Sequence, residues 1–203
     1  MMNRLGTRAQ AGTGGTDASQ ALVWTETDSP LGKLTLCRSE AGLCRVEFGG
    51  WEARSCSAKA WAHRWSPASP FREDAEDELL REAAEQLRRY FAGELRTFDL
   101  PLDLKGTPFQ RQVWQALRDV PYGETAAYRD IAAAVGAPKA VRAVGGANNR
   151  NPVPIIVPCH RIIGANGAMV GYGGGLPIKE HLLALESSLV GAEAMGHGRE
   201  SLV

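Results

Sequence analysis

The chain has 203 residues, of which 44% are hydrophobic and 23% are charged, a balance that is typical of a folded globular protein. Its 23 basic residues equal its 23 acidic residues, which argues against a protein that coats nucleic acid through a uniformly basic surface. No run of about 18 apolar residues occurs and the N-terminus lacks the apolar stretch of a signal peptide, so we expect neither a membrane span nor secretion.

The two ends of the chain contain little that a folded core could bury. Residues 1–20 are polar and rich in glycine, threonine and alanine, and residues 191–203 look similar. Because such segments cannot bury enough apolar surface to offset the entropy lost on ordering, we expect a disordered tail at 1–20 and a flexible tail at 191–203.

Residues 22–50 predict three β-strands, because apolar and polar residues alternate in three runs that turn sequences separate. In the third run, Cys44, Val46 and Phe48 should share one face. This pattern favours Cys44 as a small buried hydrophobic residue rather than a reactive thiol. The four cysteines form no CxxC pair, which is typical of a protein from a reducing intracellular compartment.

Residues 71–92 predict a helix, with acidic residues in its first turns, two arginines near its end and Gly93 after it. The sequence FDLPLDL that follows marks the boundary to a second unit. We therefore expect an N-terminal domain at 21–100 and a C-terminal domain at 101–190.

The second unit opens with a helix and continues with a helix-turn-helix. Residues 107–110 can form a capping box, with a proline at the first helical position. Thr125 can cap a short helix that Gly136 ends, and Pro138 begins another helix that runs to about Ala147. Two short helices joined by a tight turn that contains glycine predict a helix-turn-helix.

The second helix of that pair presents small residues instead of the polar side chains that read base sequence. Arg142 is the one long side chain in its middle, and the small residues include Ala140, Ala143 and Gly145. Small residues allow close approach to a DNA groove, although they equally suit packing of helix against helix. Residues 101–180 hold nine basic and five acidic residues, and this local positive charge favours DNA binding.

Residues 151–163, NPVPIIVPCHRII, bring three prolines and an apolar run to Cys159. Val157 precedes a proline, which biases it to extended geometry, so a stiff segment should present Cys159 and His160 at a fixed place. A free cysteine is mostly a neutral thiol at neutral pH and needs a neighbouring base to become a good nucleophile. Adjacent side chains on an extended chain point apart, so proton transfer to His160 would need a bend or a bridging water.

The closing helix, which begins at Pro177, adds an acidic residue to this pair. Glu186 lies on the flank of the apolar stripe, and a partly buried carboxylate needs a partner. Pairing with His160 would give a Cys–His–Glu arrangement in which Glu186 orients the histidine. The alternative is a carboxylate bonded to a backbone amide or to solvent. The glycine-rich loop 169–175 before the helix fits the lining of a flat pocket, with Tyr172 as one wall.

These blocks closely resemble the O6-alkylguanine-DNA alkyltransferase family. The resemblance covers the whole second unit without a gap and, more weakly, parts of the first at 28–36 and 90–95. It is carried by PFQRQVWQAL (108–117), PYGETAAYRDIA (121–132), PKAVRAVGGANNRNP (138–152), NPVPIIV (151–157), PCHR (158–161), GYGGG (171–175) and KEHLLALE (179–186).

The resemblance implies an α+β protein in which a small N-terminal antiparallel-sheet domain, RNase H-like, precedes a C-terminal winged helix-turn-helix alkyltransferase domain. Such a protein would act as a cytoplasmic monomer and bind double-stranded DNA containing O6-alkylguanine through the minor groove. Ala140, Ala143, Gly145 and Tyr128 would lie at the DNA. Arg142 would intercalate in place of the extruded nucleotide as the damaged base flips into the protein.

The same matching implies the roles of the site residues. Cys159 would accept the alkyl group, His160 would be its water-mediated base and Glu186 would orient the histidine. Asn151 would hold the active-site turn, and Tyr128 would stabilise the leaving base, although it also lies on the apolar face of its helix. The substrate pocket and its apolar contacts would come from Tyr172, Gly173, Val157, Pro154 and Ile162.

The implied reaction is the irreversible, stoichiometric transfer of an alkyl group from O6-alkylguanine, and also from O4-alkylthymine, to Cys159. It needs no cofactor. The sequence departs from the family at Gly173 and Ala127, where serine occurs in relatives. Animal members bind zinc in the first domain, but Ser39 stands where one ligand cysteine would be, so we expect no metal.

Three other functions compete with alkyl transfer. A non-catalytic protein that binds alkylated DNA would resemble a related family that lacks the acceptor cysteine, whereas Cys159 is present here. A helix-turn-helix transcription regulator is disfavoured by the small residues of the second helix. A cysteine hydrolase that used Cys159, His160 and Glu186 would leave the DNA-binding half unexplained.

Overall fold

The computed structural model describes the backbone of residues 21–67 and 69–196 and the side chains up to residue 189 apart from residue 68. The tail predicted at 1–20 lies outside the described residues, as do residues 197–203. Helix α6 (Leu176–Gly196) runs six residues into the tail predicted at 191–203, and the good helix formers Ala-Glu-Ala-Met in this stretch explain its length. Among the described helices, none is long and apolar enough to cross a membrane.

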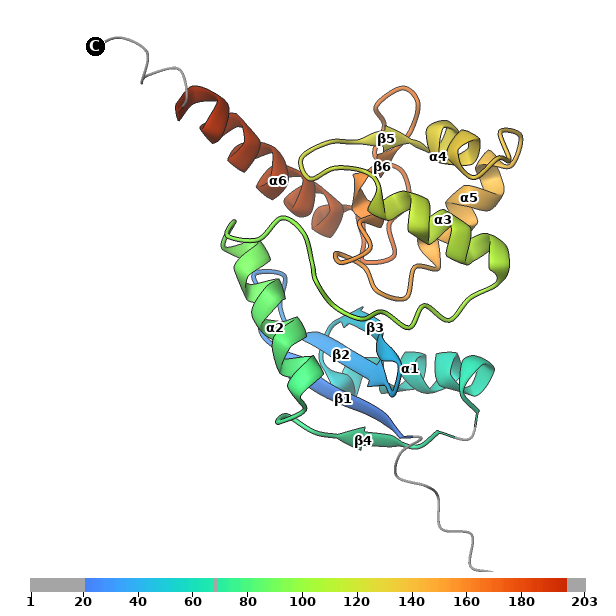
Figure 1. Cartoon of the computed structure of the whole chain (residues 1–203), viewed down its shortest axis with the longest axis vertical. Helices are drawn as coiled ribbons and strands as arrows, with labels where there is room; N and C mark the ends of the chain where they lie inside the picture. The colour runs from blue at the N-terminus through green and yellow to red at the C-terminus, as the bar shows by residue number, and fades with distance from the viewer. Residues whose placement is uncertain (1–20, 68, 197–203) are drawn as a thin grey trace, which may run out of the picture.

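The N-terminal unit is built on a four-stranded sheet with the strand order β3-β2-β1-β4 (Figure 1). Strands β1 (Leu22–Thr27), β2 (Leu34–Ser39) and β3 (Gly42–Phe48) pair antiparallel, which confirms the three predicted strands. Strand β4 (Phe71–Glu73) adds to β1 in parallel.

The start of the helix predicted at 71–92 is wrong, because residues 71–73 form β4 and helix α2 spans Glu78–Phe91. The side chain of Asp77 accepts a hydrogen bond from the amide of Leu80 and caps the helix there. Acidic residues favour both the first turn of a helix and the loop before it, so their run from residue 73 did not mark the boundary.

A β-bulge in β3 changes which side chains share a face. Cys37 of β2 pairs with Arg45, and the next residue of β2 pairs with Leu43, so Cys44 is an extra residue in β3. As a result Cys44 and Val46 lie in different core clusters, and the prediction that they share a face is wrong. Cys44 is nevertheless fully buried, and burial raises the pKa of its thiol to about 12, as expected of a packing residue.

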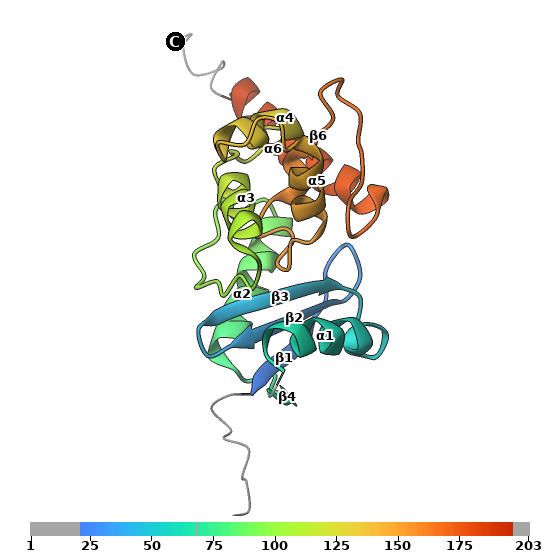
Figure 2. The same cartoon turned by 90° about the vertical axis from the view of Figure 1, so that its right-hand side faces the viewer.

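Helix α1 (Trp51–Trp65) was not predicted, because its sequence has no clear apolar stripe. It packs against one face of the sheet, where Trp51 stacks on Trp24 with ring centroids 4.1 Å apart. Helix α2 covers the opposite face with an apolar stripe that includes Leu80 and Leu87. Figure 2 shows the sheet between these two helices.

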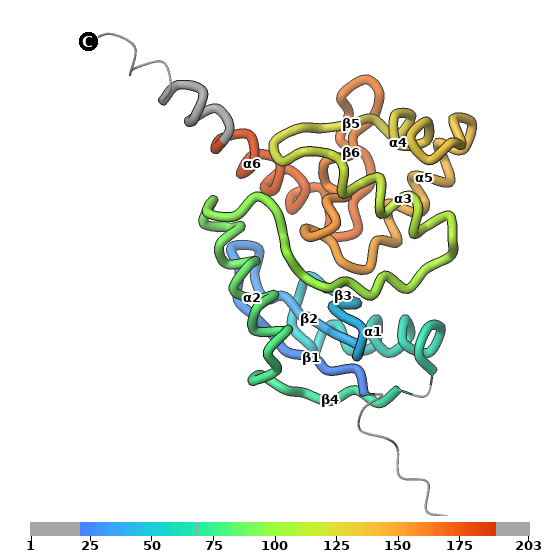
Figure 3. The backbone as a smooth tube through the Cα atoms, in the orientation of Figure 1, coloured from blue at the N-terminus to red at the C-terminus, as the bar shows by residue number. Residues whose placement is uncertain are grey.

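The segment between α2 and the next helix runs along the sheet toward the second unit (Figure 3). It is tied to β3 by two backbone hydrogen bonds, from the amide of Leu43 to the carbonyl of Pro101 at 2.8 Å and from the amide of Asp103 to the carbonyl of Leu43 at 2.9 Å. Its close approach to β3 occurs at Gly42, where φ is +149°.

The C-terminal unit contains helices α3 (Pro108–Arg118), α4 (Tyr128–Ala134) and α5 (Val141–Asn149), followed by the 3-10 turn η2 (Cys159–Arg161) and by α6. The capping box predicted before α3 is present. Thr125 does not cap α4, because residues 126–127 form strand β5 (Ala126–Ala127), which pairs in parallel with β6 (Ile162–Ile163). Helix α5 begins at Val141 rather than at Pro138.

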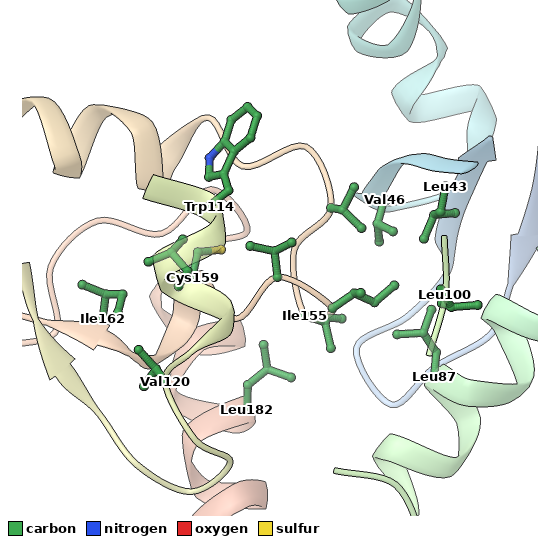
Figure 4. Close-up of a cluster of buried hydrophobic side chains, with 14 of the residues drawn as sticks. Leu43, Val46, Leu87, Leu100, Trp114, Val120, Ile155, Cys159, Ile162 and Leu182 are labelled. Carbon is green, nitrogen blue, oxygen red and sulfur yellow. The ribbon is translucent and has the colours of Figure 1, made fainter. Parts of the chain in front are cut away.

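The two units share one hydrophobic core. Figure 4 shows Leu43 and Val46 of β3, with Leu100, on one side, and Ile155 and Leu182 of the C-terminal unit on the other. Because these side chains belong to a single cluster, the sheet supports the C-terminal segment that carries Cys159.

We expect Gly42→Ala to lower the free energy of unfolding by about 3 kcal/mol, because an added Cβ would collide with the carbonyl of Pro101 and would also face a positive φ. Gly32→Ala is the matched control. Its φ is +89° but open space surrounds the position, so only the backbone cost of about 1–2 kcal/mol should appear. Equal losses in urea unfolding of the two variants would contradict the close packing at Gly42.

Candidate active site

Cys159 is the first residue of the turn η2 and is 4% exposed. The turn supplies the bend that an extended chain would lack between Cys159 and His160. The side-chain amide of Asn148 donates to the carbonyl of Cys159 at 3.3 Å, and that of Asn151 donates to the carbonyl of Val157 at 2.8 Å. Two asparagines at the end of α5 and just after it therefore fix the backbone on both sides of the thiol.

The segment that leads to Cys159 is held in an uncommon conformation. Ile155 has a φ of +74°, and among the described residues it is the only non-glycine residue in the left-handed region. For a β-branched residue this conformation costs about 1–2 kcal/mol. The cost is offset by burial, since Ile155 is 0% exposed, and by a hydrogen bond from the amide of Val46 in β3 to the carbonyl of Pro152 at 2.8 Å.

Burial makes Cys159 a poor acid. It raises the pKa of the Cys159 thiol to about 11, although hydrogen bonding from Asn151 and Tyr172 and the charge of Lys179 act in the opposite direction. At neutral pH the side chain is therefore a neutral thiol, and any reaction through its sulfur requires that a base remove the proton.

His160 follows Cys159 on the same turn and is the candidate base for this thiol. It is 0% exposed, and its Nε2 lies 2.9 Å from Oε1 of Glu186. Because a carboxylate only accepts, Nε2 carries the proton in the neutral ring and Nδ1 has a free lone pair. Nδ1 is buried without a protein partner, and burial lowers the pKa of His160 below its usual value. A neutral imidazole with an unengaged acceptor nitrogen is suited to take a proton.

Glu186 is the most heavily engaged side chain of the site. Its carboxylate is 0% exposed and accepts hydrogen bonds from His160, from Arg161 through Nε at 2.9 Å and Nη2 at 3.0 Å, and from the amide of Gly123 at 3.1 Å. The hydroxyl of Tyr90 donates to Oε1 at 2.7 Å. Although burial acts in the opposite direction, His160 and Arg161 hold the pKa of Glu186 at about 2, so it is ionised at neutral pH.

Both partners considered for Glu186 from the sequence, a histidine and a backbone amide, are present. Sequence reasoning missed Arg161 and Tyr90. Arg161 follows His160 directly, and a charged residue in an otherwise apolar segment could have indicated a buried ion pair. Tyr90 lies in another unit, 96 residues from Glu186, and nothing in its local sequence indicates the contact.

A cavity of about 260 Å³ opens beside Cys159. From the C-terminal unit it is lined by Tyr172, Gly173, Pro154 and Asn151, which the sequence analysis placed in the site. The opposite wall comes from β3 and α1 of the N-terminal unit and was not predicted; its residues are Arg45, Val46, Glu47, Phe48, Arg54 and Ser57. The predicted contacts Val157 and Ile162 are buried, and neither lines this cavity.

The end of α5, at Asn148 and Asn149, borders the cavity, and α4 packs against α5. Arg142 and Ala143 of α5 are exposed, whereas Ala140 and Gly145 are half-buried. Gly145 faces the ring of Tyr128, so at this position a small residue serves packing of helix against helix. Ala143 faces solvent, where a small residue leaves room for a partner.

Tyr128 joins the helix pair to the glycine-rich loop. Its hydroxyl donates to the carbonyl of Val170 at 3.2 Å, and the pKa of Tyr128 is raised by burial and by the nearby Cys159. Tyr128 does not line the cavity in this structure.

Both units match family models. Residues 22–104 match the model described as 6-O-methylguanine DNA methyltransferase, ribonuclease-like domain, and residues 108–188 match the model described as 6-O-methylguanine DNA methyltransferase, DNA binding domain. Together the two matches cover more than half of the chain.

The chain is also similar to curated proteins and to solved structures. A methylated-DNA–protein-cysteine methyltransferase of Mycobacterium leprae is 60% identical over 163 residues, which cover 80% of this chain and 91% of the relative. Its counterpart in Methanosarcina acetivorans is 49% identical over 161 residues, 79% of this chain and 96% of the relative. The crystal structure of Mycobacterium tuberculosis OGT in complex with DNA aligns with a TM-score of 0.69 at 44% identity and covers 82% of this chain and 94% of that one.

We expect Glu186→Gln to lower the free energy of unfolding by about 3–5 kcal/mol, because it leaves Arg161, with a side chain only 7% exposed, without its counter-charge. Glu85→Gln removes a carboxylate that likewise accepts two hydrogen bonds from an arginine, but in the exposed pair Glu85–Arg88, and it should leave the urea midpoint unchanged. A loss in Glu186→Gln no larger than that in Glu85→Gln would show that the buried charge is not a structural requirement.

Proposed function

The chain belongs to the 6-O-methylguanine DNA methyltransferase family, and on this basis we propose that it repairs DNA by transferring an alkyl group from O6 of a modified guanine to its own Cys159. One observation carries the assignment to Cys159. A buried thiol borders a cavity next to a histidine held by a buried carboxylate, and both adjoin a helix-turn-helix pair.

The chemistry that we propose is a direct displacement. The sulfur of Cys159 attacks the alkyl carbon, a carbon–sulfur bond forms, and the carbon–O6 bond of the guanine breaks. The thiol proton passes through a bridging water to Nδ1 of His160, whose charge the carboxylate of Glu186 balances. The departing guanine needs a proton or a hydrogen bond, and we assign this to the hydroxyl of Tyr128, which must leave the carbonyl of Val170 to reach the base.

The product is a thioether, which has no acidic proton and no leaving group that water could displace under cellular conditions. Each protein molecule therefore acts once, and no cofactor takes part. O4-alkylthymine presents the same kind of alkyl–oxygen bond next to a ring nitrogen, so we include it among the substrates.

The DNA partner is double-stranded and meets α5 through its minor groove. Ala143 is exposed on α5 and the half-buried Ala140 caps its start, so small residues allow this helix to approach the groove closely. The exposed Arg142 can fill the gap that a flipped nucleotide leaves. The flipped base enters the cavity, where Tyr172 forms a wall and the backbone of Gly173 allows close contact. We propose that the protein acts in this way as a monomer in the cytoplasm.

A non-catalytic role in binding alkylated DNA is the second candidate from the sequence. It would not require a thiol in the cavity, nor a base and a carboxylate behind it. The buried arrangement of Cys159, His160 and Glu186 therefore favours alkyl transfer.

We expect the protein to gain the mass of one methyl group when it is mixed with duplex DNA that contains O6-methylguanine, with the methyl on the peptide of Cys159. Cys159→Ala should gain no mass. Cys56→Ala, which removes an exposed cysteine outside the cavity, should react like the wild type. An unmodified wild-type protein with the lesion still in the DNA would refute the proposed function.

The rate of methyl transfer should be constant around neutral pH and fall only as the pH drops below 6.5. His160 accepts a proton only in its neutral form, and burial lowers its pKa from 6.5, so the neutral form persists into mildly acidic solution. The rate should be measured under single-turnover conditions. If the free thiolate of Cys159 were the reactive species without a base, the rate would instead rise about tenfold per pH unit toward its pKa of about 11.

A further inference from the structure

Tyr90 of α2 is the only N-terminal side chain that the described residues show hydrogen-bonded to the His160–Glu186 pair. It is 0% exposed, and its ring packs against Phe91, Phe98 and Tyr122. Its hydroxyl donates to Oε1 of Glu186 at 2.7 Å, the same oxygen that His160 contacts. A side chain from the sheet-bearing unit thus reaches into the site of the other unit.

We propose that Tyr90 is a positioning residue for alkyl transfer, whose hydroxyl holds the carboxylate of Glu186 in the orientation in which Glu186 holds His160. The inference rests on the proposed function. It assigns to the N-terminal unit a direct part in the reaction, in addition to its wall of the cavity.

The geometry of the carboxylate explains why one more donor matters. Oε2 accepts from Arg161 and from the amide of Gly123, and both donors lie in the C-terminal unit. Oε1 accepts from His160, Arg161 and Tyr90. A carboxylate that rotated toward Arg161 alone would release His160, so the hydroxyl of Tyr90 restrains Oε1 at the point where it meets the imidazole.

The charge of this donor also suits the role. Tyr90 is a neutral donor, and burial together with Glu186 raises its pKa, so the hydroxyl keeps its proton at neutral pH. It shares the negative charge of Oε1 without adding a positive charge near His160. The other titratable groups that act on the pair are Arg161 and Lys179, both of which disfavour protonated His160, with Tyr122 and Cys159 beside them.

The sign of the effect on His160 follows from this arrangement. Without the hydroxyl of Tyr90, the carboxylate of Glu186 can turn toward Arg161, and its hydrogen bond to His160, which raises the pKa of the histidine, weakens. The pKa of His160 then falls further below its usual value, so the rate of methyl transfer is lost at a lower pH than in the wild type.

Tyr90→Phe and Tyr122→Phe form a matched pair of variants. Each removes one hydroxyl from the same aromatic cluster, in which the two rings lie 6.0 Å apart. The hydroxyl of Tyr122 is buried and has no hydrogen-bond partner in the structure, so its removal tests the cost of an oxygen atom lost from the cluster.

The experiment measures single-turnover methylation of each variant by O6-methylguanine DNA as a function of pH, with urea unfolding as a check of folding. We expect Tyr90→Phe to react about tenfold more slowly at neutral pH, because a hydrogen bond to a charged group is lost and His160 is held less firmly. The fall of its rate on the acid side should move to lower pH by about half a unit. Tyr122→Phe should match the wild type in both readouts.

A loss of folded protein alone lowers the amplitude of the reaction but does not change the pH at which the rate falls on the acid side. A shift of that pH therefore distinguishes a positioning role of Tyr90 from an effect on stability. The inference would be overturned if Tyr90→Phe had the same rate and the same pH dependence as the wild type, or if both variants changed equally. Either result would leave the proposed function intact. A wild-type protein that takes up no methyl group would overturn both.

Discussion

The carboxylate of Glu186 is ionised at a position with 0% exposure, where an unpaired charge would cost several kcal/mol. The groups that balance this charge determine how several elements of the C-terminal unit are arranged. Arg161 lies on the turn η2, Gly123 lies on the turn before β5, and both must approach α6 for the charge to be balanced. The same requirement places His160 against Glu186, because His160 and Arg161 are adjacent residues of the turn η2. The carboxylate that pairs with Arg161 thus also orients His160.

The second constraint is that neither unit completes the site by itself. The cavity beside Cys159 has one wall from β3 and α1. The segment that leads to the thiol is held to β3 by a hydrogen bond from the amide of Val46 to the carbonyl of Pro152. The left-handed Ile155 within that segment is tolerated because it is buried in a core that both units share. The sheet is therefore a support for the chemistry as much as a separate domain.

The sequence indicated the parts of the site that depend on local pattern. The cap of α3 and the small residues of α5 follow from spacing along one element. The position of Glu186 on the flank of its stripe indicated a buried partner but did not choose between His160 and a backbone amide. Helix α1 was not predicted because its residues carry no periodic apolar stripe. The bulge at Cys44 was not predicted because the sequence of a strand with one inserted residue still looks alternating. The contact between Tyr90 and Glu186 was not predicted for a different reason. It depends on how the two units pack against each other, and the local sequence around either residue does not indicate that packing.

The burial of Cys159 has a consequence for the lifetime of the protein before it meets damaged DNA. Peroxides and disulfides react with thiolates, and a thiol that is 4% exposed with a pKa of about 11 offers them almost none. Cys56 on the surface is open to the same oxidants. In the proposed function Cys159 reacts only once, and its burial would preserve the thiol until damaged DNA brings an alkyl group into the cavity.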